Sequence, residues 1–149
     1  MKIKKELQVN ENEFFDYLVF VLLKEVRKSV DRHVKKEDLK AGYEFVRRVK
    51  DRKGNLIITR CRIEQLEAPH EYHLSMGNED ATQHIVHHVE ALDDKRIRDT
   101  YEEYTNTKNK RIFWKTRNNS SKLKDDMERT LTAFEIAVIA RRTNKKKID

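Results

Sequence analysis

Three histidines, His84, His87 and His88, lie within five residues of one another in the stretch ATQHIVHHVEALDD, residues 81–94. If this stretch were helical, His84 and His88 would share one helix face at a spacing that is common among zinc ligands. The metalloprotease motif H-E-x-x-H would nevertheless be incomplete, because Ile85 stands where that motif has its catalytic glutamate. Whether these histidines can share a metal ion therefore depends on the secondary structure that positions them.

The composition of residues 81–92 favours a strand over a helix. The stretch is rich in threonine, isoleucine and valine, and it lies between two turn signals. In a strand, His84 and His88 are about 13 Å apart, and His87 faces the opposite side. Zinc requires each ligand nitrogen within about 2.1 Å, so the three histidines cannot share one ion. We therefore expect solvated histidines on an outer sheet face, except for His87, whose face also carries apolar residues.

A cross-strand pair of histidines is a separate possibility. If GNED, residues 77–80, forms a four-residue hairpin loop, Met76 lies opposite Ala81. The same register places His73 opposite His84 on one face of the sheet. Such a pair could bind a metal adventitiously. We predict no physiological metal site and no cofactor.

The first part of the chain predicts a strand followed by a helix. Residues 1–9 alternate between polar and apolar types, as a strand with one buried face does. Asn10 and Glu13 then form a capping box, which predicts the start of a helix over about 11–31. Residues 35–42 are expected to add one or two further helical turns.

Five more strands and a long helix are predicted for the rest of the chain. After residue 43 the apolar period changes from about 3.6 residues to 2, and turn signals separate the strands. A basic segment follows, and helical spacing then resumes after serines that can cap a helix. The expected strands span 43–50, 56–66, 69–76, 81–92 and 96–107, and the expected helix spans 120–142, with a basic tail at about 144–149.

These elements predict a single α+β domain over residues 1–149. Six strands about 4.8 Å apart make a sheet about 30 Å wide. One helix with its side chains covers only about 10 to 12 Å of that width. The sheet must therefore curl around the C-terminal helix, with the first helix closing one end and an internal space left between sheet and helix.

This order of elements is that of the helix-grip fold, and two stretches carry a sequence resemblance as well. Residues 60–74, RCRIEQLEAPHEYHL, and residues 83–104, QHIVHHVEALDDKRIRDTYEEY, resemble the run of strands in START-related (SRPBCC, Bet v1-like) proteins. Within that superfamily the chain is most similar to a family of small uncharacterised proteins of Gram-positive bacteria. The resemblance implies an α+β helix-grip fold, START/SRPBCC-like, in which a curved antiparallel six-stranded sheet wraps around a long C-terminal helix and an N-terminal helix follows strand 1.

The same resemblance implies that a small hydrophobic or amphipathic molecule binds between the sheet and the long helix, and only some branches of the superfamily catalyse reactions. Strand alternation and helical spacing select the side chains that would face such a cavity. Any of them could equally belong to ordinary core packing. The candidates are Ile57, Thr59, Cys61, Ile63, Tyr72, Leu74, Met76, Ile85, His87, Val89 and Tyr101 from the strands, and Met127, Leu131, Phe134 and Val138 from the helix.

One position breaks this apolar pattern. Asp99 lies two residues before Tyr101, where alternation favours an apolar side chain. Either it marks a polar spot in the cavity, or the strand register is displaced by one residue there.

The leading hypothesis is a ligand-binding protein that is not an enzyme. In this hypothesis the ligand is oriented by His87, Tyr72 and Tyr101.

An enzyme of the hydrolase or cyclase type in the same cavity is an alternative. His87 could act as acid and base. Its partner would come from the last strand, as Asp99, Tyr101 or Glu103. The sequence contains no nucleophile elbow, P-loop, dinucleotide fingerprint or metal box, so we expect a binding protein rather than an enzyme.

The positive charge of the chain supports another alternative, the binding of nucleic acid or an anionic surface. The net charge is +7, and basic residues concentrate in segments 108–117 and 141–147. Phe113 and Trp114 offer aromatic faces for stacking, although both could instead pack the final connection onto the core. No helix-turn-helix, zinc knuckle or aromatic RNP strand is recognisable, so nucleic acid is the less expected partner.

Nothing in the sequence predicts export or a membrane span. The longest apolar run, residues 18–23, is far shorter than the roughly 20 residues that cross a bilayer. The N-terminus lacks the apolar core of a signal peptide, and the lone Cys61 excludes an internal disulfide. We expect a cytoplasmic protein, either monomeric or homodimeric.

Overall fold

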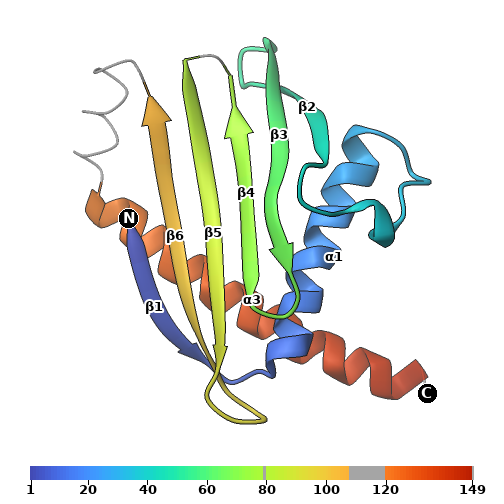
Figure 1. Cartoon of the computed structure of the whole chain (residues 1–149), viewed down its shortest axis with the longest axis vertical. Helices are drawn as coiled ribbons and strands as arrows, with labels where there is room; N and C mark the ends of the chain where they lie inside the picture. The colour runs from blue at the N-terminus through green and yellow to red at the C-terminus, as the bar shows by residue number, and fades with distance from the viewer. Residues whose placement is uncertain (79, 108–119, 149) are drawn as a thin grey trace.

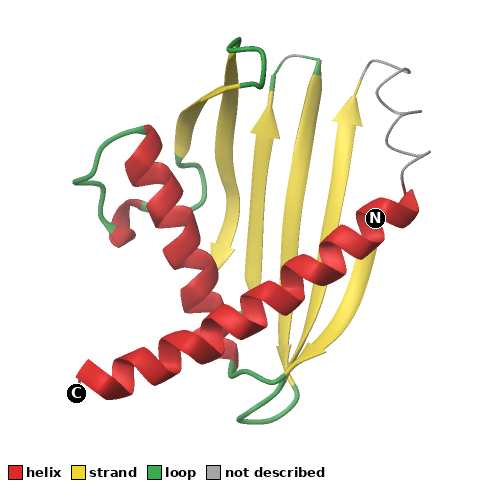
Figure 2. Cartoon of the chain, turned by 180° about the vertical axis from the view of Figure 1, so that it is seen from behind, coloured by secondary structure: helices red, strands yellow, loops and turns green. Residues whose placement is uncertain are grey.

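The structure of the protein, a computed structural model, describes residues 1–78, 80–107 and 120–148. Six antiparallel strands form one curved sheet in the order β1-β6-β5-β4-β3-β2, and helices α1 and α3 lie on its inner face (Figure 1, Figure 2). The predicted helix-grip architecture is confirmed. The elements are β1 (Lys2–Leu7), α1 (Glu11–Ser29), the 3-10 helix η1 (Lys36–Asp38), β2 (Glu44–Lys50), β3 (Leu56–Glu67), β4 (Glu71–Gly77), β5 (Ala81–Ala91), β6 (Ile97–Thr107) and α3 (Ser120–Ile148).

Helix α1 begins with the capping box that the sequence predicts. The backbone N–H of Asn10 donates to Oε1 of Glu13 at 2.7 Å, and Oδ1 of Asn10 accepts from the backbone N–H of Asn12 at 2.8 Å. These bonds satisfy backbone groups that the first helical turn leaves without partners. The apolar face of the helix is then buried through Phe14, Phe15, Leu18, Val19, Leu22 and Val26.

The β4–β5 hairpin differs from its prediction by two residues of register. Gly77 pairs with Thr82, and the backbone N–H of Asn78 donates to the carbonyl of Ala81 at 3.0 Å, so the loop begins one residue later than expected. A Cβ atom at Gly77 would lie 2.2 Å from that carbonyl oxygen, which is why glycine is required there. Every side chain keeps its predicted face, because the side-chain period of a strand is two.

Helix α3 is longer than the sequence predicts. It continues to Ile148, so residues 144–148, expected to form a tail, belong to the helix. Neither glycine nor proline occurs after residue 120, and lysine is a good helix former. None of the described helices contains an apolar stretch long enough to cross a membrane.

Helix α3 crosses the inner face of the sheet obliquely (Figure 2). It contacts β1 and α1, while α1 contacts β2 and β5. Met127, Leu131 and Val138 are buried on α3 and share one core cluster with inner residues of the sheet. The C-terminal helix therefore lies inside the curve of the sheet, as predicted.

Leu131 allows this placement of α3 to be tested. It is fully buried, so Leu131→Ala should lower the free energy of unfolding by about 2–5 kcal/mol, because the change removes packed methyl groups and leaves a cavity. Ile136 lies on the same helix but is 63% exposed, so Ile136→Ala should change that free energy by less than about 0.5 kcal/mol. Chemical denaturation measures the free energy of unfolding of both variants. Equal effects would show that α3 does not bury this face.

Candidate functional site

The inward-facing residues of the sheet are buried toward one end of the strands and exposed toward the other. Along β5, Val89 is 1% exposed, Ile85 is half-buried and Gln83 is exposed. Along β3, Ile63 is 1% exposed and Ile57 is 48% exposed. The described helices therefore cover only part of this face. We call the remainder the open half, and its inner-facing side chains are Arg47, Val49, Ile57, Thr59, Met76, Gln83 and Ile85.

The predicted cavity residues divide into two groups along this gradient. The buried group consists of Cys61, Ile63, Tyr72, Leu74, His87, Val89, Tyr101, Met127, Leu131 and Val138. The group in the open half consists of Ile57, Thr59, Met76 and Ile85, while Phe134 of α3 is partly buried against the core. Side chains thus pack the region beneath α3, where the sequence predicts an internal space, and the accessible part of the inner face is the open half.

A polar pair lies where the buried region meets the open half. His87 of β5 is 2% exposed and Asp99 of β6 is 0% exposed. Nδ1 of His87 donates a hydrogen bond to Oδ2 of Asp99 at 2.7 Å, since a carboxylate can only accept. The strand register is therefore not displaced at Asp99, because alternation holds and the carboxylate faces inward.

Aromatic rings surround the imidazole of His87. Tyr101, directly opposite on β6, stacks parallel to it with ring centroids 4.5 Å apart. Tyr72 of β4 and Phe14 of α1 make edge contacts at 5.5 and 6.2 Å. Phe134 of α3 approaches to 6.3 Å. The sheet and both long helices therefore hold this ring in one orientation.

Tyr101 extends the polar group toward the open half. Its hydroxyl donates a hydrogen bond to Oε1 of the half-buried Glu103. Burial, and next the hydrogen bond with Glu103, raises the pKa of Tyr101 above its ordinary value, and burial likewise raises the pKa of Tyr72. Both phenols therefore stay protonated at neutral pH. We call His87, Asp99, Tyr101 and Glu103 the polar cluster.

The polar cluster retains hydrogen-bonding capacity. Oδ1 of Asp99 is buried and has no hydrogen-bond partner among the described residues. Such an atom costs on the order of 1–3 kcal/mol of folding free energy. The bond to Asp99 uses Nδ1 of His87, so Nε2 of the same ring points away from that carboxylate. The cluster therefore contains an acceptor that no described residue uses, Oδ1 of Asp99, and a ring nitrogen of His87 that Asp99 does not engage.

An ion pair that the sequence analysis does not single out also lies on the inner side. Nε of Arg47 in β2 lies 2.8 Å from Oε1 of Glu25 in α1, in a geometry that is not an aligned hydrogen bond. The alternation of Phe45, Arg47 and Val49 in β2 is the signal that could have placed Arg47 inside. Burial raises the pKa of the neighbouring Cys61, although the charge of Arg47 opposes this. Cys61 therefore packs as a small apolar residue rather than as a thiolate.

The histidines of the outer face pair diagonally. His73 lies directly opposite Val86, yet its Nε2 is 2.8 Å from Nδ1 of His84. The predicted direct pairing of His73 with His84 is therefore wrong, because the hairpin loop is displaced along the chain. Tyr104 stacks on His84 with ring centroids 4.5 Å apart. Burial, and next the neighbouring His73, lowers the pKa of His84.

The three clustered histidines thus have three different partners. His84 contacts His73, His87 is bonded to Asp99, and Nδ1 of His88 lies 2.5 Å from Oε1 of Glu71. Within residues 1–78, 80–107 and 120–148, no group of three or more His, Cys, Asp or Glu side chains is arranged to hold a metal ion. The three histidines are therefore neighbours in the sequence because they lie on one strand, where His87 faces inward and His84 and His88 face outward.

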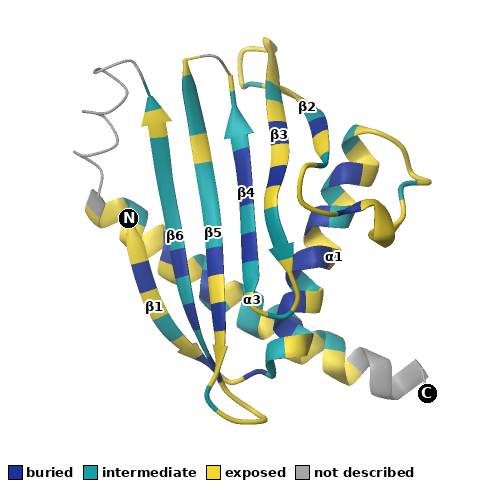
Figure 3. Cartoon of the chain, in the orientation of Figure 1, coloured by how far each residue is buried: buried dark blue, intermediate teal, exposed yellow. Residues whose placement is uncertain are grey.

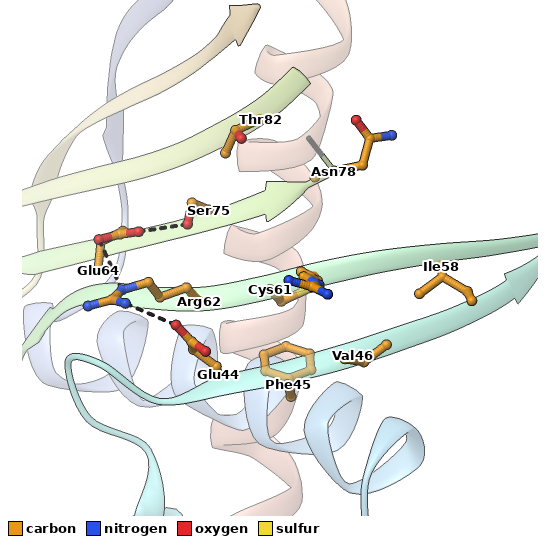
Figure 4. A pocket seen from close by; sticks show the side chains of 12 residues that line it. Glu44, Phe45, Val46, Ile58, Cys61, Arg62, Glu64, Ser75, Asn78 and Thr82 are labelled. Carbon is orange, nitrogen blue, oxygen red and sulfur yellow. Dashed lines mark hydrogen bonds and ion pairs between the residues drawn. The ribbon is translucent and has the colours of Figure 1, made fainter. Parts of the chain in front are cut away.

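The outer face of the sheet carries a groove of about 810 Å³ over β2, β3 and β4 (Figure 4). Arg62 donates from Nη1 to Oε1 of Glu44 at 2.9 Å, and its Nε lies 3.5 Å from Oε2 of Glu64. Oε1 of Glu64 accepts from the hydroxyl of Ser75 at 2.8 Å. These polar groups are therefore paired with one another. Two smaller grooves, of about 420 and 510 Å³, lie near the N-terminus of α1, and none of the three lies between sheet and α3.

The structure describes only part of the two basic segments. Segment 108–117 lies outside the described residues. In segment 141–147, Nε of Arg142 donates to Oε2 of Glu13 at 3.2 Å, and the guanidinium of Arg141 lies 4.2 Å from the ring centroid of Phe20. Both arginines therefore make contacts within the chain.

Removal of one member of the buried His87–Asp99 pair should strongly destabilise the folded chain. Asp99→Ala should lower the free energy of unfolding by about 3–5 kcal/mol, because it leaves His87 without its partner in an apolar surrounding. Glu90 pairs with Arg98 on the exposed face, with 3.7 Å between Oε2 and Nη1, so Glu90→Ala should cost less than about 1 kcal/mol. Urea denaturation compares the two. An Asp99→Ala variant as stable as Glu90→Ala would contradict the buried pair.

The outer histidine pair should make stability depend on pH. The pKa of His84 is lower in the folded chain than its ordinary value of 6.5, so the unfolded chain binds more protons between these two values. The free energy of unfolding should therefore fall as pH decreases below about 6.5, and His84→Gln should remove that part of the decrease. Denaturation at several pH values measures this pH dependence of the free energy of unfolding. His33→Gln, in an exposed loop, is the control, and an unchanged pH profile for His84→Gln would contradict the assignment.

Solved structures share this fold at low sequence identity. Ara h 8.0201 is similar with a TM-score of 0.56 and 13% identity, over 94% of this chain and 97% of its own. A protein from Arthrobacter aurescens is similar with a TM-score of 0.58 and 13% identity, over 94% of this chain and 85% of its own. A conserved protein from Geobacillus kaustophilus is similar with a TM-score of 0.54 and 13% identity, over 97% of this chain and 94% of its own. These likenesses show the fold alone.

The family of the chain follows from its sequence. No curated protein matches it. Residues 1–120 match the family described as Domain of unknown function (DUF3284), a span that contains all six strands and α1. Because this match covers most of the 149 residues, the protein belongs to the DUF3284 family.

Proposed function

We propose that this protein binds a small hydrophobic or amphipathic molecule in the open half of the inner face, without catalysing a reaction. The gradient of burial carries the proposal, because apolar side chains continue along the strands beyond the region that the helices cover. Ile57, Met76 and Ile85 lie there on three neighbouring strands, and none of them is fully buried. A ligand that covers them removes apolar surface from water, which contributes about 25 cal/mol per Å².

The polar cluster supports an amphipathic ligand with a defined orientation. Glu103 is its least buried member and lies next to the open half, directly opposite Ile85. Its carboxylate is a hydrogen-bond acceptor. The ligand therefore places its apolar part along the open half and directs a donor, such as a hydroxyl or an amine, toward Glu103.

The resemblance to START-related proteins supports the same proposal, because that superfamily implies small hydrophobic ligands between sheet and C-terminal helix. We propose both that the chain belongs to this superfamily and that it binds such a ligand. The proposed position differs from the enclosed space expected from the sequence, since Leu131 and Met127 occupy the region beneath α3. The ligand instead lies farther along the strands, toward the β2–β3 and β4–β5 turns.

Acid–base catalysis at the polar cluster is a second candidate, and the bond between His87 and Asp99 is the observation that favours it. Asp99 sets the tautomer of His87 and leaves Nε2 of that ring as the reacting atom. A substrate would have to reach an imidazole that is 2% exposed and enclosed by aromatic rings. Binding without catalysis is therefore the better supported function.

Ile57 and Ile58 form a matched pair for testing the proposal. They are neighbours in β3, 48% and 53% exposed, and they face opposite sides of the sheet. Ile57→Glu should weaken binding of the neutral dye Nile red or of oleyl alcohol at least about tenfold, because it places a charge on the apolar surface. Ile58→Glu should keep the affinity within about twofold of the unmodified protein. Fluorescence titration measures the dye, and native mass spectrometry measures the alcohol complex.

The opposite pattern would contradict the proposal. If Ile58→Glu alone removed binding, the ligand would lie in the outer groove, which Ile58 lines. If neither substitution changed the affinity, the open half would not be the binding site. Circular dichroism confirms that both variants remain folded, which their exposed positions favour.

A further inference from the structure

The tip of the β2–β3 hairpin is largely exposed (Figure 3), and apolar side chains lie on both of its faces. On the inner side, Val49 is 44% exposed and pairs with Ile57, which is 48% exposed. On the outer side, Leu56 and Ile58 are 56% and 53% exposed. A ligand in the open half covers only the inner pair. The outer pair therefore needs a different explanation.

Basic residues accompany these aliphatic side chains. On the outer face Lys50 lies directly opposite Leu56, and Arg48 lies directly opposite Ile58. Residues 48–60 contain five basic residues, all exposed, and one acidic residue, Asp51. The hairpin tip thus combines a local net charge of +4 with apolar side chains, a concentration of charge separate from the two basic segments that the sequence reveals.

The single acidic residue, already counted in this net charge, shapes the tip of the hairpin. Oδ1 of Asp51 accepts hydrogen bonds from the backbone N–H groups of Lys53 and Asn55, at 2.9 and 2.8 Å. The backbone N–H of Asp51 in turn donates to the carbonyl of Asn55 at 2.9 Å, and Gly54 takes the positive φ of 82° that the turn requires. The carboxylate is therefore used inside the turn, which holds the aliphatic and basic residues in place.

We propose that the β2–β3 hairpin docks this protein onto the surface of a bilayer that contains anionic phospholipids. A flat partner surface covers one face of a strand pair, whereas the interface of a bilayer surrounds an inserted tip on both faces. Lys and Arg side chains keep their charged ends at the headgroups while aliphatic neighbours reach the acyl boundary. Nucleic acid is less suited to this surface, because the exposed side chains are aliphatic and offer no ring for base stacking.

The position of the hairpin is compatible with such docking. Its turn lies at the end of the sheet that also carries the β4–β5 turn, away from the β5–β6 turn at the opposite end (Figure 1). The open half borders this same end, since Ile57 belongs to both surfaces. Docking does not depend on the ligand proposal, because Leu56 and Ile58 lie on the face that a ligand in the open half does not touch.

Vesicle flotation of the full chain tests the proposal. The protein should bind vesicles of phosphatidylcholine with about 30 mol% phosphatidylglycerol, and at least about tenfold more weakly vesicles of phosphatidylcholine alone. Raising NaCl from about 100 mM to about 500 mM should lower the first affinity at least about tenfold, because salt screens exposed charges. Equal binding to both vesicles, or no binding to either, would overturn the proposal.

Paired substitutions locate the contact. Leu56→Ser with Ile58→Ser should weaken vesicle binding at least about tenfold, because less apolar surface leaves water. Ile136→Ser with Ile139→Ser, which removes two exposed isoleucines of α3, is the matched control and should have less than about a twofold effect. Nile red binding without vesicles should persist in the hairpin variant, so failure of docking and failure of the ligand site are distinguishable.

Charge reversal supplies an independent comparison. Arg52→Glu with Lys53→Glu should weaken binding to the anionic vesicles more than Lys122→Glu with Lys124→Glu, which makes the same change in charge on exposed positions of α3. Equal losses would show that overall charge, and not the hairpin, directs binding. Tighter binding of duplex DNA than of vesicles, lost in the hairpin variants, would assign this surface to nucleic acid. A dimer that dissociates in the Leu56→Ser and Ile58→Ser variant would assign it to a second copy of the chain.

Discussion

The breadth of the sheet relative to its helices is the constraint on which the rest of the structure depends. Six strands present one inner face, and α3 crosses it obliquely while α1 packs against β2 and β5 (Figure 2). Beneath the helices, Ile63 and Leu131 are almost inaccessible to solvent, whereas Ile57 of the same sheet remains half-exposed. Incomplete coverage by the described helices therefore divides the inner face into a packed core and an open surface.

The polar cluster lies at the boundary between these two regions. Buried charged groups usually oppose folding unless they are paired and hydrogen-bonded. His87 and Asp99 satisfy each other in part, and the stacked ring of Tyr101 and the edge of Phe14 fix the imidazole. One carboxylate oxygen nevertheless has no partner among the described residues. A fold that needed only stability could place apolar side chains here, so this arrangement favours a role in recognition.

The β2–β3 hairpin separates two kinds of surface within a few residues. Successive side chains of a strand face opposite sides, so Ile57 belongs to the inner face and Ile58 to the outer face. The inner side continues into the open half, while the outer side pairs aliphatic residues with Arg48 and Lys50. A single strand can thus contribute to ligand binding on one side and to docking on the other.

Local patterns in the sequence predict which way side chains face, and tertiary packing decides how far each is covered. Residues two apart in a strand share a face whatever the strand meets, so alternation correctly directs Tyr72 and His87 inward even though the β4–β5 register differs by two. The capping box at Asn10 is equally local. By contrast, the burial of Leu131 and the exposure of Ile57 depend on where α3, distant along the chain, crosses the sheet. The β5–β6 hairpin brings Asp99 to His87, as the sequence could suggest. Only long-range packing decides how much of the inner face the described helices cover, because no short stretch of sequence encodes the angle between a helix and a sheet.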